Sequence, residues 1–170
     1  MLAKVNCCAL VGIDGVPVEV EVNVSRGQPR TTLIGLPGAA VREALDRVST
    51  AMRNSGLTFP SQRHLTINLA PADLRKEGAS YDLALVLGLL ASTGQLPPDA
   101  LDGALVLGEL SLDGSVRHVR GVLPAAILAA SQGLECMFVP APDAAEAALV
   151  PAVTVYPVDH LISLVEHLLE

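Results

Sequence analysis

The chain has 170 residues, a formal net charge of −7 and 51% hydrophobic residues, few of them aromatic. A chain of this length can bury roughly two thirds of its unfolded surface, so one core without disulfides or metals is expected. The acidic balance makes the domain as a whole a poor match for a nucleic-acid backbone, although it leaves room for local basic patches.

The sequence carries no targeting or membrane signal. Its longest apolar run, residues 83–91, is far shorter than the roughly 20 residues that span a bilayer. The three cysteines, Cys7, Cys8 and Cys136, are odd in number and lack C-x-x-C spacing, which argues against a disulfide framework and a zinc site. We therefore expect a cytoplasmic protein with buried thiols, no bound metal and no membrane contact.

The first third of the chain predicts a hairpin, a strand and a helix. Residues 3–12 and 16–25 are apolar-rich, and valine at every other position of the second segment gives the period of a half-buried strand. Asp14-Gly15 tolerates the positive φ of the turn between them. A strand at 31–36 leads to an amphipathic helix at 37–55. Its charged face, which we expect to be solvated, consists of Arg42, Glu43, Asp46, Arg47 and Arg53.

The rest of the chain continues the alternation of strands and helices. A strand at 65–69 precedes a helix at 81–93 that is apolar nearly all round and should be the central buried helix. The remaining predicted elements are a hairpin of residues 104–112 and 116–119, a helix to about 132, a strand at 136–139, a short helix at 143–149 and a last helix capped by Asp159. This order predicts an α/β (α+β) fold, a mixed β-sheet with β-hairpins and covering helices, in a single domain over residues 1–170.

Three segments together resemble one family. They are residues 68–78 (NLAPADLRKEG), 108–114 (GELSLDG) and 119–126 (VRGVLPAA). These segments are similar to the N-terminal domain of the magnesium-chelatase-like AAA+ ATPases of the ComM (YifB) type. The resemblance implies a Lon-protease-like (ribosomal protein S5 domain 2-like) fold placed before an ATPase module.

The resemblance also implies partners and cofactors. Such ATPases assemble as homo-hexameric rings, and the competence protein is associated with branch migration of DNA during DNA uptake. The 170 residues contain no G-x-x-x-x-G-K-[ST] motif, so no cofactor is expected here and ATP and Mg²⁺ would bind in the ATPase module. Contact with DNA is expected through the assembled ring.

Ser80 is the one candidate for catalysis. By the resemblance it stands where Lon-type proteases carry their nucleophile, but Leu123 stands where they carry the lysine base, and leucine cannot accept a proton. Lys76 and His118 could replace that base only if folding brought them to Ser80. We therefore expect no peptidase activity and interpret Ser80 as the N-cap of the following helix, with Asp82 favoured by the helix dipole.

A small group of basic residues is the candidate contact surface for DNA or a neighbouring domain. It consists of Arg75, Lys76, Arg117, His118 and Arg120. These residues flank the two loops around the candidate serine. Ordinary ion pairing with nearby carboxylates is the competing interpretation.

Three functions follow from the sequence. The first is a non-catalytic domain of a ring ATPase that supports assembly and DNA handling. The second is a divergent Lon-type serine peptidase that uses Ser80. The third is a free-standing DNA-binding module.

Overall fold

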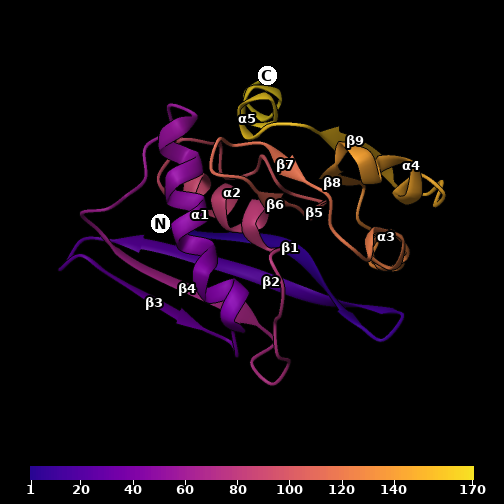
Figure 1. Cartoon of the computed structure of the whole chain (residues 1–170), viewed down its shortest axis with the longest axis horizontal. Coiled ribbons are helices and arrows are strands. Elements are labelled where there is room, and N and C mark those ends of the chain that lie inside the picture. Colours follow the sequence, from indigo (N-terminus) through magenta and orange to yellow (C-terminus); the bar gives the residue numbers. More distant parts are fainter.

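The computed structural model describes residues 1–170 and contains a seven-stranded mixed sheet covered by helices (Figure 1). The strands of this sheet are β1 Leu2–Val11, β2 Asp14–Ser25, β3 Arg30–Ile34, β4 His64–Ala70, β5 Ala104–Val106, β8 Cys136–Pro140 and β9 Thr154–Val158. Their order is β3-β4-β2-β1-β5-β8-β9, so β3 and β9 form the two edges. β2 is antiparallel to both of its neighbours, and the other four pairs are parallel. The predicted mixed α/β fold is confirmed.

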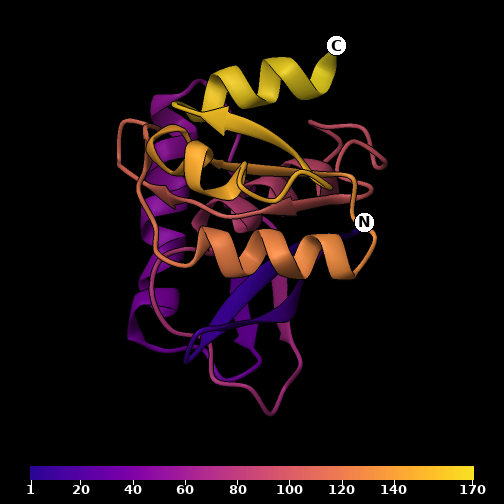
Figure 2. The ribbon, with the colours of Figure 1, turned by 90° about the vertical axis from the view of Figure 1, so that its right-hand side faces the viewer.

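Helices lie on both faces of the sheet (Figures 1 and 2). They are α1 Ala39–Asn54, α2 Asp82–Ser92, α3 Val122–Ser131, α4 Ala144–Ala147 and α5 Leu161–Leu169, with a 3₁₀ turn η1 at Ala141–Asp143. Every residue of α2 is buried, as its apolar sequence predicted. Gly88 of α2 faces Val22 so closely that an added Cβ would lie 2.6 Å from Cγ2 of that valine. On the other face, α3 meets the hairpin at Gly15, where an added Cβ would lie 2.8 Å from the carbonyl oxygen of Pro124.

The first hairpin turns two residues earlier than the sequence predicted. Val11 pairs with Asp14, so Gly12 and Ile13 form the turn and Gly12 has the positive φ of 63°. Asp14 and Gly15 belong to β2. This register places the alternating valines against α2, and burial of that apolar face outweighs the local turn preference of Asp-Gly.

The second predicted hairpin divides into two structures. β5 joins the main sheet, whereas β6 Glu109–Leu110 and β7 Val116–Arg117 form a separate two-stranded sheet. The chain separates at Gly108, whose N–H donates to the carbonyl of Ser80 and whose carbonyl accepts from the N–H of Leu83. These non-local bonds were not visible in the sequence.

Two features near the C-terminus also differ from the prediction. β9 was not predicted, although it pairs with β8 along its whole length. The N-cap of α5 is His160 rather than Asp159: its Nδ1 accepts from the N–H of Ile162 at 3.1 Å, and its Nε2 lies 2.8 Å from the carbonyl oxygen of Asp113. Asp159 instead offers its backbone carbonyl to the N–H of Val116.

Candidate functional site

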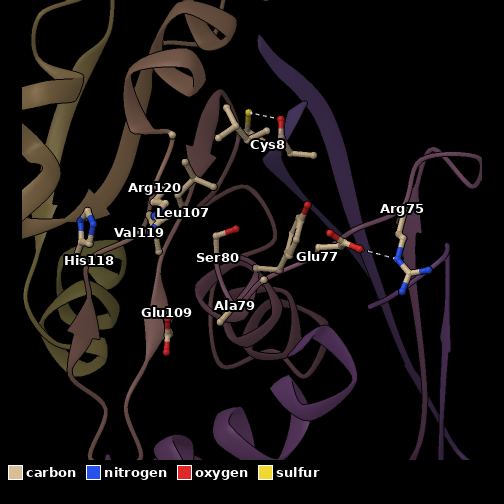
Figure 3. A pocket seen from close by; sticks show the side chains of 15 residues that line it. Cys8, Arg75, Glu77, Ala79, Ser80, Leu107, Glu109, His118, Val119 and Arg120 are labelled. Carbon is tan, nitrogen blue, oxygen red and sulfur yellow. Dashed lines mark hydrogen bonds and ion pairs between the residues drawn. The ribbon is translucent and has the colours of Figure 1, made fainter. Parts of the chain in front are cut away.

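The candidate site is a cleft of about 470 Å³ where three segments meet (Figure 3). One wall is the end of β1, residues 8–10, and another is the segment 118–121 that leads into α3. Residues 77–81 before α2 line it as well, together with Arg75, Leu107 and Glu109. The fold therefore brings the motif segments 68–78 and 119–126 to one place, as the sequence suggested.

Ser80 lines this cleft and is partly exposed. Its hydroxyl has no hydrogen-bond partner among the side-chain bonds of the chain, and it does not cap α2. The N-cap position is Tyr81, which lacks a side-chain cap bond, so the N-cap prediction for Ser80 is wrong. The backbone carbonyl of Ser80 instead anchors the segment by accepting from the N–H of Gly108 at 3.0 Å.

Lys76 is an internal residue rather than a surface cation. Its side chain is fully buried, and Nζ donates to the carbonyl oxygens of Gly35, at 2.8 Å, and Pro71. Its backbone N–H donates to Leu36 and its carbonyl accepts from Gly38, which ties the loop after β4 to the start of α1. Burial lowers the pKa of this amine.

The structure therefore corrects the place of Lys76 among the candidate contact residues. An ammonium with no exposed surface cannot reach DNA or a neighbouring domain. Nor does it line the cleft that contains Ser80. Its interactions with two carbonyl groups are structural, because they hold the Lys76 loop against β3 and β4.

His118 lies in the cleft but is directed by a different partner. Its Nδ1 contacts a carboxylate oxygen of Asp143, which is buried and also accepts from the N–H of Val119 at 3.0 Å. Figure 3 shows His118 and Ser80 on separate parts of the lining, and no hydrogen bond joins them. Asp143 was not singled out in the sequence, since only the fold brings it to the histidine.

Leu123 occupies the position at which Lon-type proteases are expected to carry their lysine base. Leu123 lies in the first turn of α3, half-buried and outside the cleft lining. Lys76 is buried elsewhere and His118 contacts Asp143, and no hydrogen bond joins the Ser80 hydroxyl to either side chain. A serine hydroxyl is a weak nucleophile unless a base is within hydrogen-bond reach.

The other basic candidates differ in whether they line the cleft. Arg75 and Arg120 line it together with His118, but Arg75 is already paired with Glu77 at 2.8 Å. Arg117 lies outside the lining and donates to the hydroxyl of Ser111. Two carboxylates, Glu77 and Glu109, lie among these cations, so the rim of the cleft has mixed charge.

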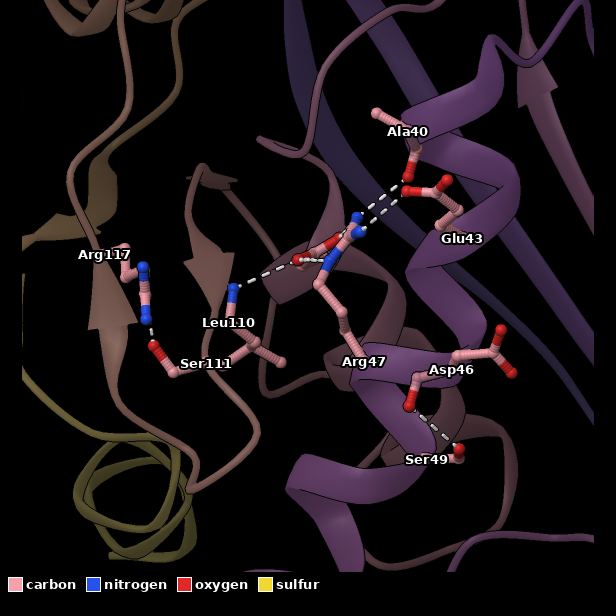
Figure 4. Close-up of polar contacts among 9 residues, drawn as sticks. Ala40, Glu43, Asp46, Arg47, Ser49, Leu110, Ser111 and Arg117 are labelled. Carbon is pink, nitrogen blue, oxygen red and sulfur yellow. Dashed lines mark hydrogen bonds and ion pairs between the residues drawn. The ribbon is translucent and has the colours of Figure 1, made fainter.

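A buried ion pair behind the cleft was missed in the sequence (Figure 4). Asp82 is fully buried and accepts from Nε and Nη2 of Arg47 at 2.8 and 2.9 Å, and from the N–H of Leu110 at 3.1 Å. Arg47 also donates to the carbonyl of Ala40 and lies 3.8 Å from Glu43. Its assignment to the solvated face of the helix is therefore wrong. The pair connects α1, α2 and β6, and Asp82 stands two residues after Ser80 in the chain.

The ionisation of this pair follows from its burial. Burial raises the pKa of the Asp82 carboxyl, whereas the hydrogen bonds from Arg47 and from the Leu110 N–H lower it. Hydrogen bonding to Asp82 raises the pKa of the Arg47 guanidinium. Removal of either partner would leave the other in a low-dielectric environment without compensation.

The described residues form no cluster of three or more metal-ligating side chains. Cys7 and Cys8 are buried, Cys136 is half-buried, and all three are free thiols. No helix has both the length and the apolar character needed to cross a membrane.

The fold and the cleft define a Lon-protease-like α/β domain whose cleft contains Ser80. The family model described as subunit ChlI of Mg-chelatase matches residues 20–143. The chain therefore belongs to this Mg-chelatase-like family.

Individual relatives agree with this assignment. The chain is 42% identical over 160 residues to the uncharacterized protein YifB of Salmonella typhimurium, covering 94% of this chain and 31% of YifB. It is 41% identical over 167 residues to the competence protein ComM of Haemophilus influenzae, covering 98% of this chain and 32% of ComM. Lon protease 2 of Bacillus subtilis is 26% identical in an alignment 153 residues long, which covers 80% of this chain and 27% of that protease. The chain thus spans about a third of the length of these relatives.

Proposed function

We propose that the chain is a non-catalytic N-terminal domain of a ComM-like ring ATPase, where it supports assembly and DNA handling. The observation that carries this proposal is the isolation of Ser80. Its hydroxyl is not hydrogen-bonded to a base: Nζ of Lys76 donates to two backbone carbonyls, and His118 contacts Asp143. A cleft that keeps its shape without activating its nucleophile is suited to a scaffold.

The remaining activities belong to the proposed parent protein. It would bind ATP and Mg²⁺ in an AAA+ module of the same polypeptide, assemble as a homo-hexamer in the cytoplasm and act on DNA in competence or recombination. Support comes from the Mg-chelatase family model and from the similarity to ComM. Within this domain, contact with the ATPase module would use Arg75, Arg117, His118 and Arg120. Lys76 is removed from this set because it is buried.

Labelling with a serine-directed fluorophosphonate tests the non-catalytic assignment. Wild-type chain and Ser80→Ala should give equal, background labelling. In the parent ATPase, Ser80→Ala should also leave DNA-stimulated ATP hydrolysis unchanged. Rapid labelling that disappears in Ser80→Ala would contradict the proposal.

The second candidate function is a divergent peptidase, and one observation favours it. Ser80 and His118 line the same cleft, and Asp143 holds His118 through Nδ1 in the way that an acid orients a catalytic histidine. A substrate that drew Ser80 and His118 together would complete a serine–histidine–aspartate arrangement. Selective loss of labelling in both Ser80→Ala and His118→Ala would support this function over the scaffold.

A free-standing DNA-binding module is the third function. A reading frame that continues past Glu170 into a phosphate-binding loop motif would favour the ring ATPase over this module. A stop codon at that point, with tight DNA binding by the 170-residue chain at physiological salt, would favour the module.

A further inference from the structure

Four arginines gather at the end of the sheet opposite the hairpin turn of Gly12 and Ile13. We propose that they form a binding surface for the phosphates of single-stranded nucleic acid, with the cavity beside them receiving a base. We call this surface the basic corner, and it consists of Arg26, Arg30, Arg53 and Arg63. The inference rests on the DNA handling proposed above and assigns that contact to a different part of the domain.

The sheet register brings these cations together from distant parts of the sequence. His64 at the start of β4 pairs with Arg30 of β3 on one side and with Ser25 of β2 on the other. Arg26 follows Ser25, and Arg63 precedes His64. Since neighbouring strands lie roughly 4.8 Å apart, this part of the corner extends about 10 Å across three strand ends. At the left of Figure 1, the β2–β3 turn, the start of β4 and the N-terminus lie close together.

The arginine side chains are available for a ligand. Arg26, Arg30, Arg53 and Arg63 are all exposed, and none forms an ion pair with a carboxylate. Nε of Arg30 donates to His64 at 3.0 Å, which holds that arginine at the strand edge. These four represent a large part of the 11 lysines and arginines in a chain with net charge −7. Such segregation of positive charge produces a local attraction for polyanions despite the acidic total.

A cavity of about 560 Å³ opens between the basic corner and the C-terminal end of α2. Its lining includes Met1, Phe59 and Arg63 and contains no carboxylate. The remaining polar groups are the hydroxyl or amide side chains of Thr58, Ser61, Gln62, Ser92, Thr93 and Gln95. Arginines, hydroxyls and amides are the groups with which proteins contact phosphates and sugars, whereas amides also hydrogen-bond to bases.

Phe59 gives the cavity a flat apolar surface. It is half-buried against the core, and the guanidinium of Arg53 lies over its ring, 5.7 Å from the centroid. An unpaired base can stack on such a ring while its phosphates contact the arginines. A duplex offers phosphates but keeps its bases stacked inside, so this combination favours a single strand.

The candidate cleft is a weaker site for a polyanion. Arg75 and Arg120 share its lining with Glu77 and Glu109, and Arg75 is already paired with Glu77. The basic corner has no comparable negative groups in its cavity lining. The two surfaces can be distinguished by mutation, because they lie at different ends of the sheet.

The test measures fluorescence anisotropy of a labelled single strand of about 30 nucleotides with the whole 170-residue chain. If three or four phosphates are engaged, the affinity should fall roughly 20- to 50-fold between about 50 and 200 mM salt. Arg26→Glu/Arg63→Glu should weaken binding by about tenfold or more at the lower salt concentration. Neither side chain has a hydrogen bond or ion pair to lose. Phe59→Leu, which keeps an apolar side chain, should weaken binding by roughly fivefold or more.

The matched control is Arg42→Glu/Arg120→Glu. It makes the same change in net charge at two exposed arginines near the cleft end, and these also lack side-chain partners. It should weaken binding by less than about threefold. An equal or larger loss in this control overturns the inference while leaving DNA handling intact, because binding would then lie near the cleft.

Other outcomes overturn the inference in different ways. If a duplex of the same length binds as tightly as the single strand, no unpaired base is needed, and the proposal that the cavity receives a base is wrong. Poly-glutamate that competes as well as DNA assigns the basic corner to an acidic protein segment. If the 170-residue chain does not bind the single strand, the inference is also wrong. If the parent ATPase does not bind DNA either, the proposed DNA handling itself is wrong.

Discussion

Removal of Arg47 should destabilise the domain in a pH-dependent way. Arg47→Met keeps the aliphatic part of the side chain but removes two of the three hydrogen bonds to the fully buried Asp82. A buried charge that loses its partner typically costs about 3–5 kcal/mol. The Asp82 carboxylate can avoid that cost only by taking up a proton.

Proton uptake sets the size of the effect at each pH. Relative to an unfolded aspartate with a pKa of about 3.9, protonation costs about 4.9 kcal/mol at pH 7.5 but only about 1.5 kcal/mol at pH 5. In Arg47→Met the folded-state pKa of Asp82 is raised, so stability is lost as pH rises from the unfolded pKa through the folded pKa. The loss relative to wild type should therefore be about 3–5 kcal/mol at pH 7.5 and about 2 kcal/mol at pH 5.

Urea denaturation followed by far-ultraviolet circular dichroism measures this loss, since the chain has no tryptophan for fluorescence. Arg42→Met on the exposed face of the same helix is the control and should change the free energy of unfolding by less than about 0.5 kcal/mol. Arg47→Met/Asp82→Asn should recover part of the loss and remove its pH dependence, because no buried charge remains. A loss below about 1 kcal/mol, or one of equal size at both pH values, would refute the reasoning.

Three further substitutions test individual contacts. Gly35→Ala should prevent stable folding or cost more than about 3 kcal/mol, because its Cβ would lie 2.1 Å from the carbonyl oxygen of Leu69 at a φ of +104°; a melting temperature like that of wild type would contradict this. Burial raises the pKa of Cys8 from 9.0 to about 11, so stability is lost as pH rises through this window, and Cys8→Ala should remove up to about 2.7 kcal/mol of that alkaline loss in urea titrations; an unchanged pH slope would exclude it. His160→Ala removes the cap on the Ile162 N–H and should lower the melting temperature by about 2–4 °C, whereas His160→Asn should retain most of the cap; equal melting temperatures of His160→Ala and wild type would show that the cap contributes nothing.

The elements with strong periodicity could be predicted from the sequence. Alternating valines define β2, and the continuous apolar sequence of α2 matches its complete burial. The turn at Gly12 could not be predicted, since Asp14-Gly15 has the stronger local signal and only packing of the sheet against α2 selects the register. β9 was missed because its neighbour β8 supplies all of its pairing, which no local pattern reveals.

The candidate residues could be named from the sequence, but their contacts could not be derived from it. Spacing did not predict that Ser80 and His118 line one cleft. The burial of Lys76 depends on the carbonyl groups of Pro71, in the same loop, and of Gly35, which is 41 residues earlier in the chain. Charged side chains on a helix surface usually contact water. The pairing of Arg47 with Asp82 therefore could not be predicted without knowing that α2 packs against α1. The contacts that the fold creates, rather than residue type, determine the environments of Lys76, His118 and Arg47.

The two edges of the sheet differ in a way that limits how copies of the domain can join. Thr154 of β9 donates to Glu135 towards the interior, so the alternate positions face outward, and one of them is Pro157, which has no N–H. β3 contains no proline, so each of its residues has a backbone N–H that can donate a hydrogen bond. Head-to-tail continuation of a sheet from one copy to the next needs both edges. Strand addition at β9 would lack the hydrogen bond that Pro157 cannot donate, whereas β3 contains no such interruption.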